Sequence, residues 1–420
     1  MIGDADHNQS EYFQWFRHTP MLSICTFRYH QQALHRCRGL VGKSFANCAD
    51  TPAMTTRTKD LANTILLSDA VDKGSILQRR LALSRAITLI ESQSPKHVEQ
   101  ANLLLNHVTR FKRIRGGGGG VIPGDNKRSF RVGIAGAPGA GKSSFIESFG
   151  KFVLDELPLQ RKHAEEKSID LDKLAVVCID PSSSITGGSI LGDKTRMMDL
   201  SRHQKAFVRP SPTRGVLGGL SSYTNDVVTL CEAAGYDLVL VETVGLGQSE
   251  IDISQTVDML VLVVSPGGGD GLQGAKKGIL ELSDMIIVNK ADGSLLTAAR
   301  TTAADYKGAT HFFRSRMDGW ETPPVLLASA ETGEGIPEVW GELLRYKEVV
   351  TTSGVLQSRR SQQARYWLWK HIQEQITHKI RSDESIRLMA DELEHDLEQG
   401  LIAPRAAASK LLDLSTHNST

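Results

Sequence analysis

The stretch Gly136-Ala-Pro-Gly139-Ala-Gly141-Lys142-Ser143 decides the fold that this sequence predicts. It matches G-x-x-x-x-G-K-[ST] in full and lies between a β-rich segment, 130–135, and a helical one. In such a loop the glycines, Gly136, Gly139 and Gly141 with Ala140 between them, let backbone N–H groups surround phosphate oxygens. Lys142 is expected to reach the β and γ phosphates, and Ser143 to coordinate Mg²⁺. A chance glycine turn is the alternative, and the flanking strand and helix count against it.

Outward from this loop, short β-rich segments alternate with helical ones. The β-rich segments are residues 130–135, 174–179, 238–242, 259–264, 285–288 and 325–328. Such alternation is typical of a parallel sheet with helices on both faces. We therefore predict an α/β fold of the P-loop NTPase type, with a mostly parallel sheet. Helical regions are expected to flank it at both ends of the chain.

A second motif follows the predicted strand 238–242, which ends in the carboxylate of Glu242. Thr243-Val-Gly245 comes next, and Gly245 is expected to meet the γ-phosphate. Glu242 stands where Asp is more usual, so its carboxylate reaches one methylene further. Because Mg²⁺ keeps several waters and prefers oxygen ligands, we expect Glu242 to hold Mg²⁺ through a bound water. An exposed residue at a strand end is the alternative.

A third motif, Asn289-Lys290-Ala-Asp292, predicts that the nucleotide is GTP or GDP. An Asp here can accept hydrogen bonds from N1–H and the exocyclic amine of guanine, and adenine offers no such pair of donors. An unpaired buried acceptor costs about 1 to 3 kcal/mol, so ATP should be rejected. Asn289 is expected to brace the loop and contact the base edge, and Lys290 to lie along the base. Ser329 and Ala330 would close the base pocket with a backbone N–H.

Two further carboxylates occur where a nucleotide-responsive loop is expected. Asp180 follows the predicted strand 174–179, and Asp193 lies in the polar, glycine-rich stretch 181–196. Magnesium ligation and a solvated loop position remain open for both. Residues 266–273 likewise have the composition of a loop that leaves a strand beside the nucleotide.

The composition is that of an ordinary soluble globular protein of 420 residues, with 49 basic and 48 acidic side chains. This balance gives no support to nucleic-acid binding. No apolar run approaches the roughly 18 residues that a membrane span needs. Five cysteines without a C-x-x-C pair indicate a reducing compartment and no structural zinc.

The N-terminal region reads as a mitochondrial presequence, because residues 12–49 contain no Asp or Glu and several Arg. Three acidic residues precede it, so either the signal tolerates them or translation starts at Met21 instead of Met1. A disordered tail without a targeting signal is the alternative.

We predict the following organisation: presequence 1–57, N-terminal helical domain 58–115, Gly-rich hinge 116–128, GTPase domain 129–352, C-terminal helical arm 353–412 and tail 413–420.

The C-terminal arm has an apolar stripe, which more often serves packing or association than ligand binding. It consists of Trp367, Trp369, Ile372, Ile376 and Ile380.

Taken together, the motifs resemble one family closely, the GTPase chaperones of methylmalonyl-CoA mutase, also described as the methylmalonic aciduria type A proteins. The resemblance covers roughly residues 60–380. Its motifs are Gly136 to Ser144, 179–184, 192–197, 209–215, 241–250 and 289–292.

The resemblance implies a protein of the mitochondrial matrix that gates delivery of adenosylcobalamin from its adenosyltransferase to the mutase and ejects damaged cofactor, with GTP as the switch. It implies that Asp180, Asp193 and Glu242 form the magnesium shell and that Arg196 approaches the phosphates. Residues 267–277 would form an extra switch loop, and the C-terminal helices a dimerisation arm. A homodimer is therefore expected, with cobalamin held by the partners.

One departure concerns the catalytic glutamine. Many GTPases place it directly after the switch glycine, whereas Gln248 comes three positions after Gly245. We therefore predict slow intrinsic hydrolysis that the mutase accelerates by ordering the loops and Arg196.

Two alternatives differ in class. A metal-insertion GTPase would need His or Cys clusters, which the sequence lacks. An ATPase or kinase linked to basic-amino-acid transport would use ATP, against which Asp292 argues.

Overall fold

The computed structural model describes most of the chain after residue 52. The described residues are 53–66, 73–92, 94–115, 129–159, 173–180, 197–212, 222–243, 249–267, 277–311, 313 and 317–417. The chain divides into two units, Met1–Ala53 and Met54–Thr420, and nearly all described residues belong to the second. The predicted hinge and nearly all of the predicted presequence lie outside the described residues, so both stay predictions.

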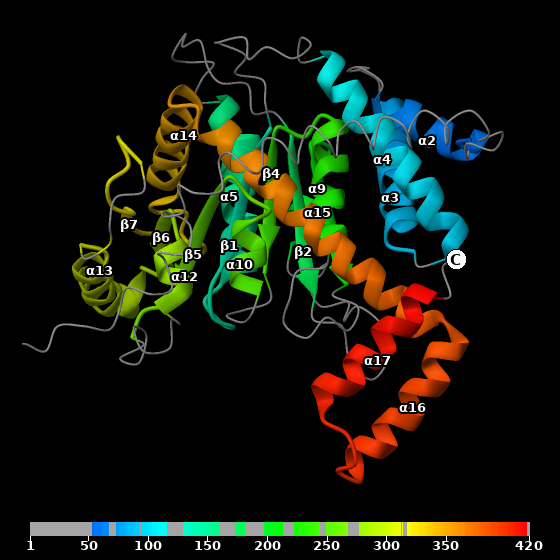
Figure 1. The fold of residues 1–420 in the computed structure, drawn as a ribbon. Coiled ribbons are helices and arrows are strands. Elements are labelled where there is room, and N and C mark those ends of the chain that lie inside the picture. The colour runs from blue at the N-terminus through cyan, green and yellow to red at the C-terminus, as the bar shows by residue number, and fades with distance from the viewer. Residues whose placement is uncertain are drawn as a thin grey trace, which may run out of the picture. The chain divides into compact units, whose positions relative to one another are not determined.

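Within the described residues, one sheet of seven strands forms the centre of the protein. The strands are β1 (Phe130–Ala135), β2 (Leu174–Asp180), β3 (Ala206–Pro212), β4 (Leu238–Glu242), β5 (Met259–Val264), β6 (Met285–Val288) and β7 (Val325–Leu327). Their order is β3-β2-β4-β1-β5-β6-β7, and each neighbouring pair is parallel. Figure 1 shows the labelled strands from β7 to β2 in this order. The predicted parallel α/β fold is confirmed.

Strand β1 lies in the middle of the sheet, between β4 and β5. Ile134 is in register with Glu242 of β4 and with Val261 of β5. Strand β4 is buried at all five positions, as expected for a parallel strand covered on both faces. Since all strands run in one direction, the carboxyl ends of β1, β4 and β6 lie at the same edge, where open α/β sheets bind their ligands.

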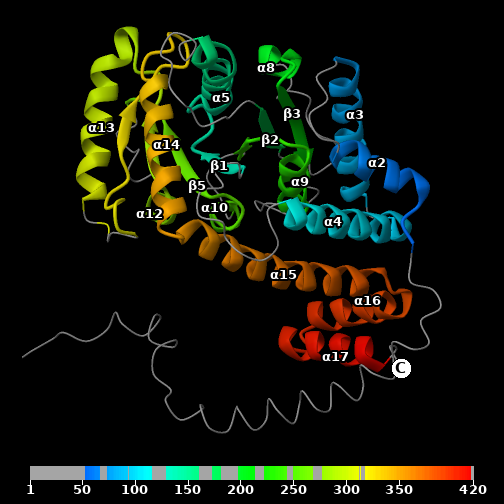
Figure 2. The ribbon, with the colours of Figure 1, turned by 90° about the horizontal axis from the view of Figure 1, so that it is seen from above.

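Helices cover both faces of the sheet. One face packs against α5 (Lys142–Lys151), the π-helix η2 (Phe152–Glu156), α8 (Met198–Arg202) and α14 (Ile336–Thr352). The other face packs against α9 (Ser222–Ala233), α10 (Ser249–Ser254), α12 (Lys277–Leu282) and α13 (Leu296–Thr310), which a 3-10 turn, η3 (Gly293–Leu295), precedes. In Figure 2, β1 lies between α5 and α10. Alternate residues of each strand therefore enter different cores, as the two-residue period of a strand requires.

Three N-terminal helices extend one of these cores. They are α2 (Thr56–Leu66), α3 (Lys73–Ile90) and α4 (Pro95–Arg115). Both α3 and α4 contact α9. Just after α3, the buried Glu91 accepts a hydrogen bond from Arg209 of β3 at 2.6 Å, with its other oxygen 3.4 Å from the Ser211 hydroxyl. The N-terminal helices are thus joined to the edge strand of the sheet by packing and by an ion pair.

The C-terminal region forms three helices, α15 (Val355–Ser382), α16 (Glu384–Glu398) and α17 (Pro404–His417). The start of α15 is fixed to the sheet by Arg360, which donates to Asp258 at 2.6 Å and to the carbonyl of Ser129 at 2.7 Å. Asp383 caps α16 by accepting from the N–H groups of Ser385 and Ile386. Among the helices in the described part of the chain, none is long and apolar enough to cross a membrane.

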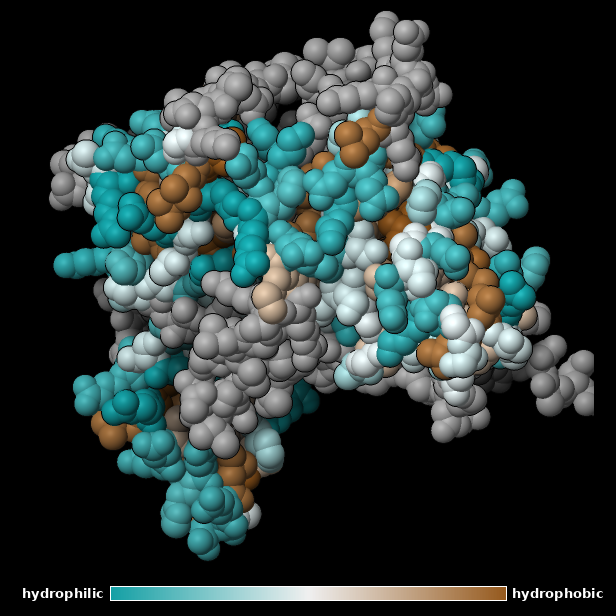
Figure 3. Space-filling view, turned by 180° about the vertical axis from the view of Figure 1, so that it is seen from behind, coloured by the Kyte–Doolittle hydropathy of each residue, from teal (hydrophilic) through white to brown (hydrophobic). Residues whose placement is uncertain are grey.

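The predicted apolar stripe of α15 divides into two sets. Trp367 is only 2% exposed, and its Nε1 donates to the carbonyl of Gln255 at 2.7 Å, just after α10. Trp369 and Ile376 are 64% and 49% exposed. Packing within the chain therefore accounts for Trp367, whereas Ile372 and Ile380 are half-buried and Trp369 and Ile376 are exposed. Figure 3, seen from behind, shows hydrophobic residues as separate patches on a mainly hydrophilic face.

Strand β3 was not predicted from the sequence. Pro210 and Pro212 interrupt its apolar pattern, and a strand with internal prolines reads as irregular. The structure accommodates them because β3 lies at the edge of the sheet and pairs only with β2.

Candidate functional site

The phosphate-binding loop connects β1 to α5, as predicted. Gly136 approaches β5 so closely that an added Cβ would lie 2.1 Å from the carbonyl oxygen of Val263. Gly139 and Gly141 have φ of 81° and 86°, the left-handed region that favours glycine. These positions explain the three glycines: one provides clearance and two provide the turn that leads into α5.

The two polar residues at the start of α5 are both buried. Lys142 is 7% exposed, and its Nζ donates to the carbonyls of Gly136 at 2.9 Å and Ala137 at 3.2 Å. The lysine is thus folded back along the loop, and its ammonium group contacts two backbone carbonyls of the phosphate-binding loop. Phosphate oxygens carry full charge and are stronger acceptors than these carbonyls.

The hydroxyl of Ser143 donates to Oε1 of Glu242 at 2.7 Å. The register of β1 and β4 brings these two side chains together, because Glu242 is the last residue of β4 and pairs with Ile134 of β1. Both side chains are buried, Ser143 at 8% and Glu242 at 6% exposure. A hydroxyl and a carboxylate form a hard oxygen donor pair of the kind that Mg²⁺ uses beside nucleotide phosphates. The residues present therefore fit a magnesium ion.

Sequence reasoning did not single out Thr243, which fixes the end of β4. Its N–H donates to the carbonyl of Ile134 at 3.1 Å, so the ladder between β4 and β1 continues one residue past Glu242. The only signal in the sequence is a β-branched residue directly after the carboxylate.

Asn289 braces three loops. Its Nδ2 donates to the carbonyls of Ala140 at 3.1 Å and Gly141 at 3.2 Å, and its Oδ1 accepts from the N–H of Ala330 at 3.2 Å. Asn289 is 1% exposed, and its own N–H donates to Val264 of β5. The side chain thus ties the phosphate-binding loop to the loop that follows β7, as a bracing residue should. In this arrangement the Ala330 N–H is engaged by Asn289.

Lys290 and Asp292 lie on the exposed side of the same segment. Lys290 has φ of 59°, rare for a residue with a side chain, and its Nζ donates to the carbonyl of Gly139 at 2.9 Å. Asp292 accepts from the Ser329 hydroxyl at 2.5 Å, and that hydroxyl oxygen accepts from the N–H of Thr332 at 3.1 Å. The carboxylate of Asp292 is therefore held in place by the loop after β7.

The structure thus brings together residues that are separated by up to about two hundred positions in the sequence. These are Gly136, Gly139, Ala140, Gly141, Lys142, Ser143, Glu242, Asn289, Lys290, Asp292, Ser329 and Ala330. Ser144 follows on α5 and is exposed. Asp180 is the last residue of β2, and its side chain is outside the described part of the structure. The whole residues Asp193, Arg196, Gly245 and Gln248, and most of 267–277, are outside it too. Roles for these residues stay predictions.

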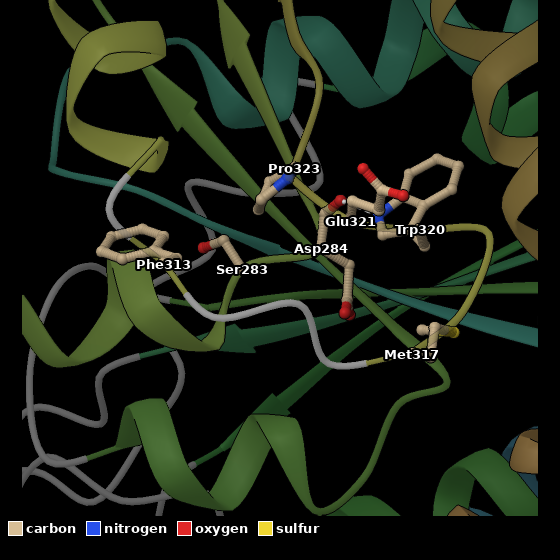
Figure 4. A pocket seen from close by; sticks show the side chains of 7 residues that line it. All are labelled: Ser283, Asp284, Phe313, Met317, Trp320, Glu321 and Pro323. Carbon is tan, nitrogen blue, oxygen red and sulfur yellow. Dashed lines mark hydrogen bonds between the residues drawn. The ribbon is translucent and has the colours of Figure 1, made fainter.

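A separate cavity lies away from this edge, near the start of β6 (Figure 4). It is lined by Ser283, Asp284, Phe313, Met317, Trp320, Glu321 and Pro323. Its volume is about 10 Å³, which is room for about one water molecule. Ser283 and Asp284 precede β6, whereas Asn289 follows it. The cavity is therefore too small for a nucleotide and does not belong to the site.

Known proteins are similar to this chain over most of its length. A family model described as "Methylmalonyl Co-A mutase-associated GTPase MeaB" matches residues 83–385. The methylmalonic aciduria type A homolog, mitochondrial, of Mus musculus is 41% identical over 347 residues, which cover 82% of this chain and 78% of that protein. GTPase ArgK of Escherichia coli (strain K12) is 38% identical over 332 residues, covering 79% and 92%.

Among solved structures, one titled "Crystal structure of LAO/AO transport system kinase" is similar, with a TM-score of 0.58 and 29% identity. The match covers 87% of this chain and 100% of that one. It therefore includes more than the nucleotide-binding sheet.

Proposed function

The chain belongs to the family of methylmalonyl-CoA mutase-associated GTPases, and we propose that it is a chaperone of methylmalonyl-CoA mutase that gates the loading of adenosylcobalamin. It binds and hydrolyses GTP as its switch, and it protects or reactivates the mutase when the cofactor is damaged. One observation supports this proposal above the others: the Ser143–Glu242 pair and the Ser329–Asp292 pair lie beside the phosphate-binding loop in a chain whose residues 83–385 match this family.

The nucleotide site supplies the switch. Lys142 would leave the carbonyls of Gly136 and Ala137 for the β and γ phosphates, because charged oxygens compete favourably for its protons. Ser143 and Glu242 would hold Mg²⁺, together with Asp180 and Asp193. The ion would neutralise charge on the phosphate oxygens. Asp292, positioned by Ser329, would accept from guanine, and Asn289 and Lys290 would keep the base loop against the phosphate loop.

Intrinsic hydrolysis is slow in this proposal, and the mutase accelerates it. Arg196 and Gln248 belong to loops that the partner orders around the γ-phosphate, and residues 267–277 report the partner's presence. Arginine placed beside the transferring phosphoryl group stabilises its developing charge. The control of rate by a partner is what allows nucleotide state to act as a signal.

The partners and location follow the same proposal. A cobalamin adenosyltransferase supplies adenosylcobalamin, and the mutase receives it. The protein acts in the mitochondrial matrix after residues 1–57 direct it there; relatives from mouse and worm are named mitochondrial. Two copies associate through the helices that begin with α15.

The first test measures binding of labelled GTP, GDP and ATP, alone and with methylmalonyl-CoA mutase. We expect preference for guanine nucleotides and a mutase complex whose stability depends on the nucleotide. Guanine binding without such a complex would contradict the chaperone role and leave the GTPase intact. A preference for ATP would instead favour the reading as an ATPase or kinase.

A second test compares single-turnover GTP hydrolysis with and without mutase. Acceleration by the mutase is expected, and Arg196→Ala should remove most of it. Equal rates in the presence and absence of mutase would contradict partner control.

A further inference from the structure

Helix α10 reaches from the nucleotide edge of the sheet to the opposite edge. Strand β4 ends at Glu242, which bonds Ser143, and the chain enters α10 at Ser249 shortly afterwards. Strands β4 and β5 both run parallel to β1, so the chain has to return to the opposite edge before β5 begins at Met259. Helix α10 is the described element between them. Its start therefore follows the strand that carries Glu242, and its end lies away from the nucleotide.

Between these two ends, α10 packs directly on β1, the strand that leads into the phosphate-binding loop. A Cβ at Gly133 of β1 would lie 2.8 Å from Cδ1 of Ile253 and 3.0 Å from Cγ2 of Val257. Ile253 has no exposed surface, and Val257 is 2% exposed. Gly133 lies three positions before Gly136, the first glycine of the loop. Because close-packed interiors transmit displacements, a shift of α10 against β1 reaches the phosphate-binding loop, and the reverse holds too.

Helix α15 passes the end of α10 (Figure 2) and holds it with donors from two buried side chains. Nε2 of Gln363 donates to the carbonyls of Ser254 at 3.2 Å and Val257 at 2.7 Å. Nε1 of Trp367 donates to the carbonyl of Gln255 at 2.7 Å. Gln363 is 3% exposed and Trp367 is 2% exposed. Since the last carbonyls of a helix have no partner within it, α15 satisfies groups that α10 cannot satisfy itself.

An acid within α10 makes a second contact with α15. The hydroxyl of Tyr366 donates to Oδ1 of Asp252, and Nζ of Lys370 lies 3.6 Å from Oδ2. Asp252 is only 5% exposed, and a buried carboxylate is costly unless it is paired and hydrogen-bonded. A displacement of α10 along α15 would leave this carboxylate and the buried carbonyls without partners. The position of α10 and its bonds to α15 therefore depend strongly on each other.

We propose that α15 responds to the bound nucleotide through α10, and that the bonds of Gln363 and Trp367 couple the C-terminal helices to the GTP site. The inference rests on the proposed function. GTP and GDP differ in the γ-phosphate, which that function places beside Lys142 and the Mg²⁺ held by Ser143 and Glu242. These residues follow β1 and end β4, the two strands to which α10 is joined. Coupling is reciprocal, so loss of the bonds to α15 must alter the relative affinities for the two nucleotides.

The test measures dissociation constants of the full chain for a non-hydrolysable GTP analogue and for GDP, both with Mg²⁺. Gln363→Met removes two of the three bonds and Trp367→Phe the third, and both keep most of the side-chain volume. The ratio of the two constants should change by about fivefold or more in Gln363→Met, and by less but in the same direction in Trp367→Phe. Gln362→Met, at the exposed neighbour of Gln363, is the matched control and should leave the ratio unchanged. A ratio within about twofold of the original in both variants would overturn the inference.

Hydrogen exchange locates the coupling. Protection of residues 363–370 should differ between the GTP-analogue and GDP complexes of the original chain, and this difference should shrink in Gln363→Met. Equal protection in the two complexes would overturn the inference and leave the GTP site intact. An original chain that binds neither nucleotide would instead contradict the proposed function, and this inference with it. If Gln363→Met does not fold, Trp367→Phe takes its place in both measurements.

Discussion

Asp292, the residue proposed to read guanine, is held in place by its neighbours in the fold. The hydroxyl of Ser329 donates to one of its carboxylate oxygens, and Ser329 is itself held by N–H groups of its own loop. A carboxylate fixed in this way loses little conformational entropy when a base binds. In the proposed function, discrimination between guanine and other bases therefore rests on the chemistry of the carboxylate, which can only accept hydrogen bonds.

Replacing Asp292 by Asn should lower affinity for GTP by about ten- to a hundredfold, because an amide N–H would face donors of guanine and cost about 1 to 3 kcal/mol. Affinity for xanthosine triphosphate should rise, since xanthine presents a carbonyl where guanine has its amine. Equilibrium binding of the two nucleotides measures both. Asp305→Asn, an exposed change on α13, serves as the control. Equal loss for both nucleotides would contradict this base-reading role.

Two glycines in the loop before α14 allow the cost of a steric clash to be separated from the cost of a positive φ. Both have positive φ, 80° at Gly333 and 77° at Gly335, but an added Cβ meets nothing within 4 Å at Gly333 and lies 2.0 Å from the Leu327 carbonyl at Gly335. Gly333→Ala should destabilise the fold by about 1 kcal/mol and Gly335→Ala by on the order of 3 kcal/mol. Urea unfolding measures the difference, and similar losses would contradict it.

The site residues could be predicted where their roles depend on neighbours in sequence. The loop from Gly136 to Ser143 has a fixed spacing because one turn wraps one set of phosphates. The segment from Asn289 to Asp292 has a fixed spacing because one short loop is expected to meet one base. The bonds of Gln363 to the end of α10 could not be predicted, since the partners are more than a hundred positions apart and no local pattern marks either. Tertiary packing alone brings them together.

At the scale of elements, α9 and α15 meet at a half-buried acid, whose side chain is 18% exposed. Oδ2 of Asp226 on α9 lies 4.0 Å from Nε2 of His371 on α15. Burial raises the pKa of Asp226 from its ordinary 3.8 to about 7, and the charge of Glu374 adds to this effect. The folded protein thus binds the Asp226 proton more tightly than the unfolded chain does. That contribution to stability is present in full below about pH 4 and is lost as pH rises to about 7.

Asp226→Asn should therefore gain stability relative to the original chain as pH rises through this window. The difference in free energy of unfolding should grow by at most about 1.4 kcal/mol per pH unit between pH 4 and 7. Urea unfolding at several pH values measures it, with Asp305→Asn as the control. A difference that stays constant with pH would contradict the proton uptake.

Elements were predicted well where apolar segments are long, and less well at the edge strand β3 and in helix α15. Strands β1, β4, β5 and β6 match their predicted bounds. Strands β5 and β6 are uninterrupted apolar runs and β4 is one up to Glu242, as two covered faces require, whereas β1 contains Arg131 and Gly133. The division of the α15 stripe could not be seen, since the sequence does not show that Trp367 meets the end of α10 whereas Trp369 faces solvent.

For the molecule as a whole, exposed side chains on α15 bear on the proposed homodimer. Leu368 and Trp369 are 57% and 64% exposed, although α15 also makes the contacts that hold it to the sheet. Trp369→Ser should shift the protein from dimer to monomer in analytical ultracentrifugation, since aromatic anchors dominate interfaces. Leu401→Ser, at a residue 74% exposed between α16 and α17, should leave the mass unchanged. A dimer that persists in the Trp369 variant would place the interface elsewhere.

The prolines of β3 have a consequence for solubility at high protein concentration. An edge strand presents a row of backbone groups that can template a strand from another copy, which is how sheets grow into aggregates. Pro210 and Pro212 each remove a donor from that row, and β2 occupies the other side of the strand. Sheet-to-sheet polymerisation is thereby discouraged at this border.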